Sequence, residues 1–546
     1  MSNGSIVTLR IAMELVDVHT KDCALRIVVL TQAGNWVEVI APKAEVAQSH
    51  KIVQRLAGKG WVDACNPRGA KAAIDYALQG GKWPVKKVTS LTGWHGAACF
   101  VLPHRTFGAE AKSLSFAPSS NAQWKDSLGD LHIWREGLRA PCSVSSVLTF
   151  ASALAMAGAL MLPLKMPEGA IFQLTGRSST GKTLALRMAQ SASGSPESSA
   201  LLTHDLTDRA LEEHLGAAND GLLCIDELAR LHGAPAKKRT HIKQLPHVLA
   251  SGVGRARSKI VELERLERKT FRVIGFSTGE LPLESYGERE EGERVRFPDI
   301  PVPPPAENGI FDRLGDGDAK SLVEQVEATI AQNYGNAYEA FVKHLVKEKE
   351  SATKTAQKHL EDFVERAAPN GTSWDRRFAQ KFGLVFAAAA LASEWGILPF
   401  SITHARYCIL RLHRKARIEA RTLEEAKESL MVWLSTKART SHFPLLAKGK
   451  AAEPTNGKAL CGFRRGKGED RTLAVIPEEL KAKIAPGRYV DAVLTLLANE
   501  GVLRRGSDNR FVTQMAVDGF DTDRPTFYCF DLSKVPRKGE LTPEAP

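Results

Sequence analysis

The stretch AIFQLTGRSSTGKT, residues 170–183, decides the fold. An apolar run leads into GRSSTGKT, which matches the phosphate-loop pattern G-x-x-x-x-G-K-[ST], and helix-forming residues follow. In such a loop the glycines let several backbone N–H groups point at one phosphate group. The lysine then places a charge near the β- and γ-phosphates, and the threonine can hold Mg²⁺. A glycine-rich turn with an incidental lysine is the weaker reading. We therefore predict a site for ATP and Mg²⁺ formed by Gly176, Arg177, Ser178, Ser179, Thr180, Gly181, Lys182, Thr183 and Leu184.

A second apolar run, LLCIDE at residues 222–227, ends in two carboxylates 44 residues after Lys182. It is typical of a buried parallel strand, whose C-terminal end faces the ligand crevice. We predict that Asp226 joins the Mg²⁺ shell and that Glu227 orients or deprotonates the attacking water, which favours ATP hydrolysis. The alternative is an acidic helix cap.

A third apolar run, FRVIGFST at residues 271–278, ends in two hydroxyl residues. Ser277 or Thr278 would lie at the C-terminal end of this strand, where a polar side chain can contact the γ-phosphate or the water. Strands and helices alternate throughout residues 131–318, so we predict an α/β core with a parallel sheet and crossover helices.

The rest of the chain divides by composition into three further regions. Residues 1–130 alternate short apolar runs with helical stretches and predict an α+β domain. Residues 319–440, after a proline-rich break at 298–309, predict a helical lid and connector. Residues 455–540 carry a helix-turn-helix pattern followed by two strands, which indicates a winged helix.

Bulk composition narrows the class of protein. The 546 residues carry a net charge of +12 with a pI of about 9.2, which favours a polyanionic partner such as nucleic acid. The eight cysteines are widely spaced and show no zinc-ligand pattern, so we expect a reduced, cytoplasmic protein. The uncharged segments 143–163 and 382–392 approach or mimic a membrane span, but their alanine-rich composition favours buried helices and no membrane partner.

Six motifs together resemble the bacterial domain-of-unknown-function family nine-two-seven over roughly residues 20–440. They are TGWHG…FVLP, LTGRSSTGKTLALRMA, LLCIDEL, SGVGRARS, FSTGE and VRFPDIP. Members on mobile genetic elements resemble MCM-like replicative helicases, which are AAA+ rings with a pre-sensor hairpin and a C-terminal winged helix. The resemblance implies an ATP-driven DNA helicase or translocase, a homo-hexamer that replicates a mobile element. AAA+ proteins often have Asn as the sensor, so Ser277 or Thr278 is a departure.

The resemblance also implies arginines that act on the nucleotide. A neighbouring subunit would supply one of them, for which Arg294 and Arg296 are the candidates, and the lid another, for which Arg376 and Arg377 are the candidates. The alternative is that all four lie on solvated charged surfaces.

Two basic segments are candidates for DNA contact. Residues 254–270 would form an arm with Arg255, Arg257 and Lys259 on DNA phosphates in a ring pore, unless they form a charged helix in which Glu264 and Arg268 pair. Arg504, Arg505 and Arg510 would hold duplex DNA, unless the domain docks a protein. An ATPase that remodels partners on DNA without unwinding it, and a nucleotide-switched regulator, remain the rival functions.

Overall fold

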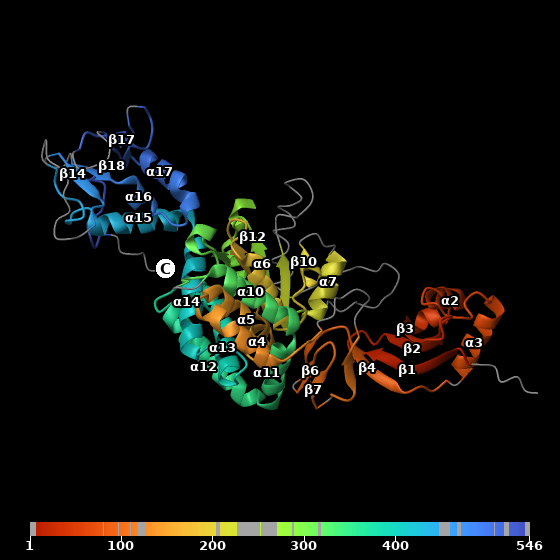
Figure 1. The fold of residues 1–546 in the computed structure, drawn as a ribbon. Helices are drawn as coiled ribbons and strands as arrows, with labels where there is room; N and C mark the ends of the chain where they lie inside the picture. Colours follow the sequence, from red (N-terminus) through yellow and green to blue (C-terminus); the bar gives the residue numbers. More distant parts are fainter. Residues whose placement is uncertain are drawn as a thin grey trace, which may run out of the picture. The chain divides into compact units, whose positions relative to one another are not determined.

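The structure is a computed structural model whose chain divides into two compact units, residues 1–413 and 414–546 (Figure 1). It describes residues 7–79, 81–96, 98–109, 111–117, 126–203, 208–226, 252, 270–286, 289–314, 318–446, 459–466, 471–506, 508–517 and 524–540.

The N-terminal part of the first unit is a five-stranded mixed sheet of order β3-β2-β1-β4-β8. Its strands are β1 (Leu9–Asp17), β2 (Cys23–Leu30), β3 (Trp36–Pro42), β4 (Val85–Thr89) and β8 (Leu114–Phe116). Alternation in β2 turns Leu25, Ile27 and Val29 to one face, where they form a core with α2 (Ser49–Ala57) and α3 (Pro67–Gln79). The short α1 (Lys43–Val46) follows β3. This region therefore contains both strands and helices.

A separate three-stranded sheet follows, made of β5 (Gly93–His95), β6 (Cys99–Val101) and β7 (Thr106–Gly108). It contains the TGWHG and FVLP motifs. Trp94 and Phe100 pack edge to face, with ring centroids 5.1 Å apart, which ties β5 to β6.

The centre of the first unit is a five-stranded parallel sheet of order β10-β11-β12-β9-β13, which confirms the predicted α/β core (Figure 1). The strands are β9 (Ala170–Thr175), β10 (Leu202–Thr203), β11 (Gly221–Asp226), β12 (Val273–Gly279) and β13 (Asp299–Pro301). β13 lies inside the segment that the sequence predicted as a proline-rich break. That prediction was wrong there, because an edge strand that ends in proline tolerates the missing N–H group.

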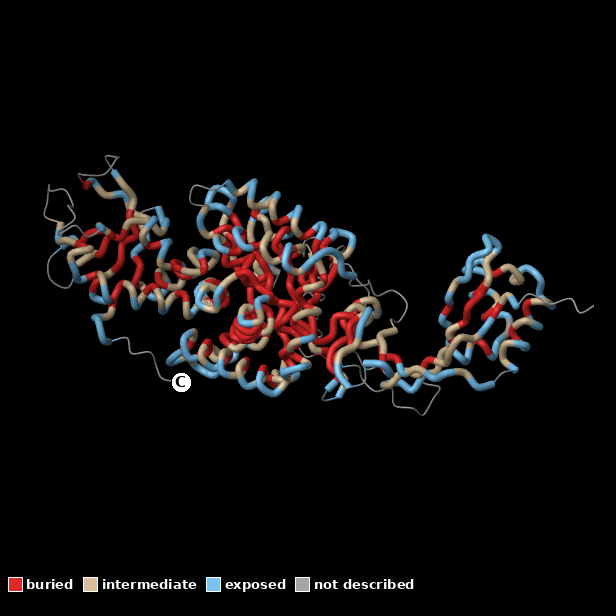
Figure 2. The backbone as a smooth tube through the Cα atoms, turned by 60° about the horizontal axis from the view of Figure 1, so that its bottom comes forward, coloured by how far each residue is buried: buried red, intermediate tan, exposed pale blue. Residues whose placement is uncertain are grey.

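Helices α4 (Leu131–Ser143), α5 (Ser146–Leu160), α6 (Lys182–Ser191) and α7 (Asp208–Ala217) accompany this sheet. Every residue of α5 is buried, and Figure 2 shows the buried interior of this part of the chain. Phe150 of α5 lies 4.9 Å from Phe172 of β9 and 5.8 Å from Phe382, measured between ring centroids. The uncharged segment is therefore core helix, as predicted. Among the described residues, no helix has the length and apolar character needed to cross a membrane.

Helices follow the sheet in the first unit. They are α10 (Ala319–Gln332), α11 (Asn336–Lys347), α12 (Lys349–Ala367) and α13 (Ser373–Glu394), and α14 (Ile402–Glu419) crosses into the second unit. α13 begins with a capping box in which Thr372 and Asp375 satisfy each other's backbone N–H groups. Its alanine-rich half, residues 382–392, is buried.

The described part of the second unit contains the end of α14, further helices and a small sheet of order β14-β15-β18-β16, with β17 beside β18. The helices are α15 (Leu423–Lys437), α16 (Pro477–Lys481) and α17 (Val490–Asn499), and η5 (Gly487–Tyr489) is a turn of 3₁₀ helix. The strands are β14 (Gly462–Arg465), β15 (Thr472–Val475), β16 (Leu503–Arg504), β17 (Thr513–Gln514) and β18 (Thr526–Asp531). α15, which the sequence reading counted with the lid, places Leu430 and Leu434 in the core of this unit.

Candidate functional site

The phosphate loop joins the C-terminal end of β9 to the start of α6. Three of its residues have positive φ: Gly176 (152°), Ser179 (62°) and Gly181 (90°). Gly181 is the N-cap of α6 and has no side chain to satisfy the first N–H groups of that helix. The loop therefore presents backbone donors at a helix N-terminus, which is the geometry that binds phosphate.

Lys182 folds back over its own loop. Its Nζ donates to the carbonyl oxygens of Gly176 at 2.8 Å and Arg177 at 2.7 Å, and it lies 3.3 Å from Oγ1 of Thr180. The ammonium group is thus held at the mouth of the loop by neutral oxygens. The positive charge of Lys182 therefore lies at the mouth of the loop, where an anion would bind.

Three side chains from three elements meet at the C-terminal edge of the sheet. Thr183 of α6 and Thr278 of β12 both direct Oγ1 at Oδ1 of Asp226, at 3.5 Å and 2.6 Å. No lysine or arginine among the described residues pairs with this carboxylate. A carboxylate and hydroxyls are the hard oxygen ligands that Mg²⁺ prefers, so these residues fit the predicted metal.

Thr278, of the two sensor candidates, is the one whose side chain reaches Asp226. Side chains alternate along a strand, so the fully buried Ser277 points to the opposite face of the sheet from Thr278. Sequence reasoning left the two residues equivalent, and the hydrogen bond from Thr278 to Asp226 separates them.

The segment after β12 adds a residue that sequence reasoning missed. Ser178 in the phosphate loop donates to Oε1 of Glu280 at 2.7 Å. Glu280 follows the sensor strand directly in FSTGE, so its place after the C-terminal end of a parallel strand was the available signal. The loop is also supported from behind, because Ile310 donates its N–H to the carbonyl oxygen of Thr180 at 3.0 Å.

Several predicted residues lie outside the described part of the chain. These are the candidate base Glu227 and the arm residues Arg255, Arg257 and Lys259. The structure describes both flanks of the arm, where the N–H of Phe271 donates to the carbonyl oxygen of Gly252 at 2.6 Å.

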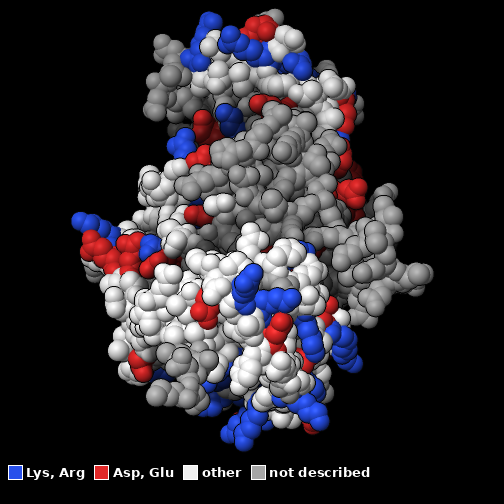
Figure 3. All heavy atoms as spheres, turned by 90° about the vertical axis from the view of Figure 1, so that its right-hand side faces the viewer, with Lys and Arg blue, Asp and Glu red and all other residues white. Residues whose placement is uncertain are grey.

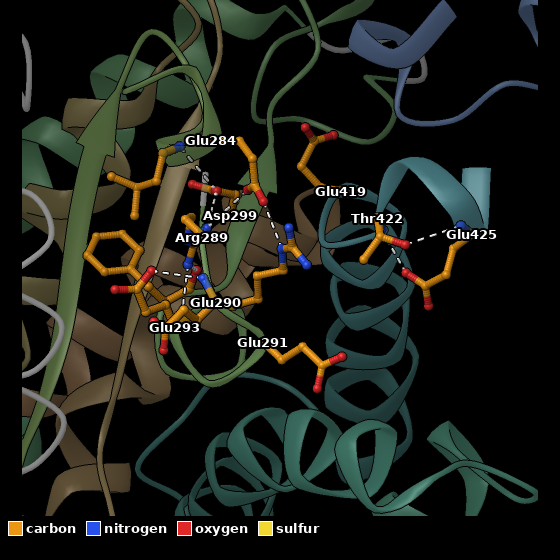
Figure 4. Close-up of polar contacts among 12 residues, drawn as sticks. Glu284, Arg289, Glu290, Glu291, Glu293, Asp299, Glu419, Thr422 and Glu425 are labelled. Carbon is orange, nitrogen blue, oxygen red and sulfur yellow. Dashed lines mark hydrogen bonds and ion pairs between the residues drawn. The ribbon is translucent and has the colours of Figure 1, made fainter. Parts of the chain in front are cut away.

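The predicted trans arginines lie on the short helix α9 (Glu291–Arg296). Nε of Arg294 donates to Glu284 at 2.7 Å, and only 13% of the Arg294 side chain is exposed. Arg289, which sequence reasoning missed, binds Asp299 of β13 at 3.1 Å (Figure 4). This buried network fixes the segment between β12 and β13, and it makes Arg294 the least accessible of the four candidate arginines.

Glu168 gathers three cations just before β9. Its carboxylate binds Arg296 at 2.7 Å, Arg377 at 3.0 Å and Lys381 at 3.2 Å. Burial raises the pKa of Glu168, but the three cations outweigh burial and lower that pKa to about 2. Burial lowers the pKa of Lys381 to about 8. The fourth candidate, Arg376, pairs instead with the exposed Glu365 at 2.7 Å.

The cluster around Glu168 lies at the opposite end of β9 from the phosphate loop. Glu168 precedes the strand, and the loop follows it. Six strand residues span roughly 20 Å, so neither Arg296 nor Arg377, as placed here, reaches the phosphate loop of its own subunit.

The same end of the sheet carries a buried ion pair beside the base of the arm. Asp220, which is fully buried, binds Nε and Nη2 of Arg272 at 2.6 and 2.8 Å. The backbone N–H of Trp94, in the TGWHG motif, donates to the same carboxylate at 2.8 Å. Gly93 has φ +89°, and a Cβ there would lie 2.3 Å from Asp220, which explains the glycine. Sequence reasoning missed this network.

The candidate DNA-binding arginines of the second unit differ in how firmly they are held. Arg504 binds Asp531 of β18 at 2.9 Å, and hydrogen bonds from Ser533 and Arg504 lower the pKa of Asp531 to about 2. Arg505 packs over the ring of Phe511. Arg510 is 77% exposed, and within the described part of the chain its side chain pairs with Asp508 at 3.1 Å.

Comparison with known proteins supplies the fold. A solved chain titled "SCCmec type IV Cch - active helicase" matches with a TM-score of 0.58 at 15% sequence identity, over 96% of this chain and 93% of that chain. At this identity the similarity establishes a shared fold and nothing more. No curated protein matches the chain.

The family match covers the N-terminal part of the chain. Residues 5–268 match "Domain of unknown function (DUF927)", a range that includes the phosphate loop and the Asp226 strand. The range begins before the predicted start at residue 20 and ends well before residue 440. The similarity to this family therefore rests on residues 5–268, a little less than half of the 546-residue chain.

Proposed function

We propose that the protein is an ATP-driven DNA helicase or translocase that works as a ring, with replication of a mobile genetic element as its setting. The observation that carries the proposal is the convergence of Thr183, Asp226 and Thr278 beside a phosphate loop whose lysine is already in place. The strand order also supports the AAA+ reading, because it puts the Asp226 strand next to the sensor strand and the sensor strand next to the phosphate-loop strand.

Each residue of the site has a defined part in this proposal. The loop N–H groups and Lys182 bind and orient the phosphates, and Thr183 with Asp226 would hold Mg²⁺. Mg²⁺, when bound, neutralises charge that develops on the phosphate oxygens. Thr278 keeps Asp226 oriented, and Glu227 would accept the proton of the attacking water.

β12 supplies the route from nucleotide to DNA. It begins one residue after Arg272, at the base of the arm, and it ends at Thr278 and Gly279 beside the loop. A shift at its C-terminal end would therefore move the residues that anchor the arm. We propose that Arg255, Arg257 and Lys259 hold DNA phosphates, without reading bases.

The proposal assigns Arg296 and Arg377 to a neighbour's nucleotide. Both lie at the far end of β9 from their own phosphate loop, where they share Glu168. Arginines in this position serve hydrolysis only if another subunit brings its nucleotide to them, which is the reason for proposing a ring.

Strand displacement on a forked duplex, measured beside ATP hydrolysis, tests the proposal. We expect ATP-dependent unwinding that Lys182→Ala abolishes with the fold intact. Arg257→Ala combined with Lys259→Ala should keep basal hydrolysis and lose its stimulation by DNA. Hydrolysis without unwinding would support a remodelling ATPase instead, and hydrolysis that ignores DNA would support a regulator. Unwinding at the normal rate by the double variant would rule out the arm.

A further inference from the structure

The N-terminal sheet leaves one face without a helical layer. Helices α2 and α3 cover the face formed by Leu25, Ile27 and Val39, and no described element packs over Trp36, Glu38 and Ile40 on β3 (Figure 1). These three alternate with the buried Val39 and Ala41, so they point away from the helices. Figure 2 shows intermediate and exposed residues along this sheet.

This open face combines an aromatic ring with two cations. Trp36 is 49% exposed, and the guanidinium carbon of Arg10 lies 5.8 Å from the centroid of its ring. Arg26 stands opposite Ile40 in the register, and Ile40 is 43% exposed. The single carboxylate on this part of the face, Glu38, contacts Arg26 at 3.5 Å, and no described carboxylate pairs with Arg10.

The charge of the surrounding domain identifies the kind of partner. Residues 7–89 contain twelve lysines and arginines against seven acidic residues, a net charge of +5 within a chain that carries +12. In Figure 3, Lys and Arg are more widely spread than Asp and Glu over the lower part of the view. A positive field of this kind attracts a polyanion.

We infer that the open face of β1–β3 is a binding platform for single-stranded nucleic acid, with Trp36 stacking on a base and Arg10 and Arg26 contacting phosphates. An exposed ring on an open sheet stacks on any base, because every base has an aromatic face. Duplex nucleic acid keeps its bases stacked inside and offers the ring nothing comparable. The platform shares no residue with the phosphate loop, so it can be tested separately from the proposed ATPase activity.

Fluorescence anisotropy with labelled oligodeoxythymidine tests the platform in the full chain, without nucleotide. The background variant is Arg257→Ala/Lys259→Ala, so that the proposed arm does not contribute. We expect Arg10→Ala/Trp36→Ala to weaken binding at least about fivefold. The matched control, Lys71→Ala/Tyr76→Ala, also removes one cation and one exposed ring, both from α3 of the same domain. It should change binding less than about twofold.

Two substitutions of opposite charge at one exposed position separate a loss of binding from a loss of folding. Ile40→Glu should weaken binding and Ile40→Lys should strengthen it, with thermal melts unchanged, because the substituted side chain points to solvent. Oligouridine of equal length shows whether the platform distinguishes RNA from DNA, and binding of either supports it. Equal effects of the two double variants, an equal loss of duplex binding in Arg10→Ala/Trp36→Ala, or no difference between Ile40→Glu and Ile40→Lys would overturn the inference.

Discussion

The two ends of β11 carry two aspartates in opposite circumstances. Asp220 precedes the strand, is fully buried, and has its charge matched by a bidentate Arg272 and by the N–H of Trp94. Asp226 ends the strand, is partly exposed, and is met by hydroxyl groups from Thr183 and Thr278. One carboxylate has a built-in counter-charge, and the other has none among the described residues.

This difference separates a structural charge from one that awaits a ligand. A buried ion pair is complete within the chain, and removing one partner leaves the other uncompensated. A carboxylate held only by hydroxyls keeps its full negative charge for a cation from solution. The same strand thus anchors the arm at one end and would anchor the metal at the other.

The largest expected effect is on ATP hydrolysis and comes from Asp226, at the C-terminal end of β11. Asp226→Asn removes the negative charge proposed for Mg²⁺ but keeps the side-chain shape. Metal ions supply several kcal/mol of transition-state stabilisation, so we expect ATP hydrolysis to fall at least about 100-fold. The thermal melting temperature should stay within about 3 °C, because no cation among the described residues pairs with this carboxylate.

Steady-state hydrolysis with a coupled phosphate assay, run beside a thermal melt, measures both quantities. A variant that lost stability and kept its turnover would reverse the roles assigned to the two aspartates.

The next largest effect is on stability and comes from Asp220, at the N-terminal end of β11. Asp220→Asn leaves Arg272 with a neutral partner beside the buried Trp94. Because the Arg272 side chain is 28% exposed and part of its charge is solvated, we expect a loss of about 2–4 kcal/mol in the free energy of unfolding. Turnover per folded molecule should change little at low denaturant.

Urea unfolding measures the loss, and Glu324→Gln is its control. Glu324 pairs with Lys320 on the surface of α10, where the two side chains are 65% and 81% exposed. That substitution should cost less than about 0.5 kcal/mol. Similar losses for the two variants would show that Asp220 is no more important than a surface charge.

Sequence reasoning predicted the site at Asp226 and missed the ion pair at Asp220, and the reason is physical. The phosphate loop, Asp226 and Thr278 each follow a recognisable apolar run, and parallel strands bring their C-terminal ends together. The partners of Asp220 are far from it in the sequence: Trp94 lies 126 residues away and Arg272 lies 52 residues away. No spacing rule joins these residues. The parallel sheet and the buried α5 were predictable because each depends on local composition.

The four candidate arginines also show that the sequence does not reveal which charged residues pair in the folded chain. Arg294, Arg296, Arg376 and Arg377 read as equivalent surface cations in the sequence. Their carboxylate partners differ: the Glu284 side chain is only 9% exposed, Glu168 is shared by three cations, and Glu365 is exposed. Glu168 lies between a turn and a strand with no motif around it, so only the folded chain reveals that α9 and α13 meet on it.

The smallest expected effect concerns this shared carboxylate and depends on pH. The pKa of Glu168 is about 2 in the folded chain, against an ordinary value of 4.5. A lowered carboxyl pKa stabilises the fold above the unfolded value and loses that contribution as the pH falls toward the folded value. At pH 7 we expect Glu168→Gln to cost about 1–2 kcal/mol, a buried-pair loss reduced because Arg377 is half exposed.

Urea unfolding of the parent and of Glu168→Gln at pH 7, 4 and 3 checks the sign. The cost of the substitution should shrink by about a quarter at pH 4 and by more than half at pH 3, because only the unfolded chain has taken up the proton. Glu365→Gln is the matched control, since Glu365 also binds an arginine of α13 but is 61% exposed. If Glu168→Gln costs the same at all three pH values, the three cations do not hold an ionised carboxylate, and Arg296 and Arg377 are free to turn toward another subunit without first breaking an ion pair.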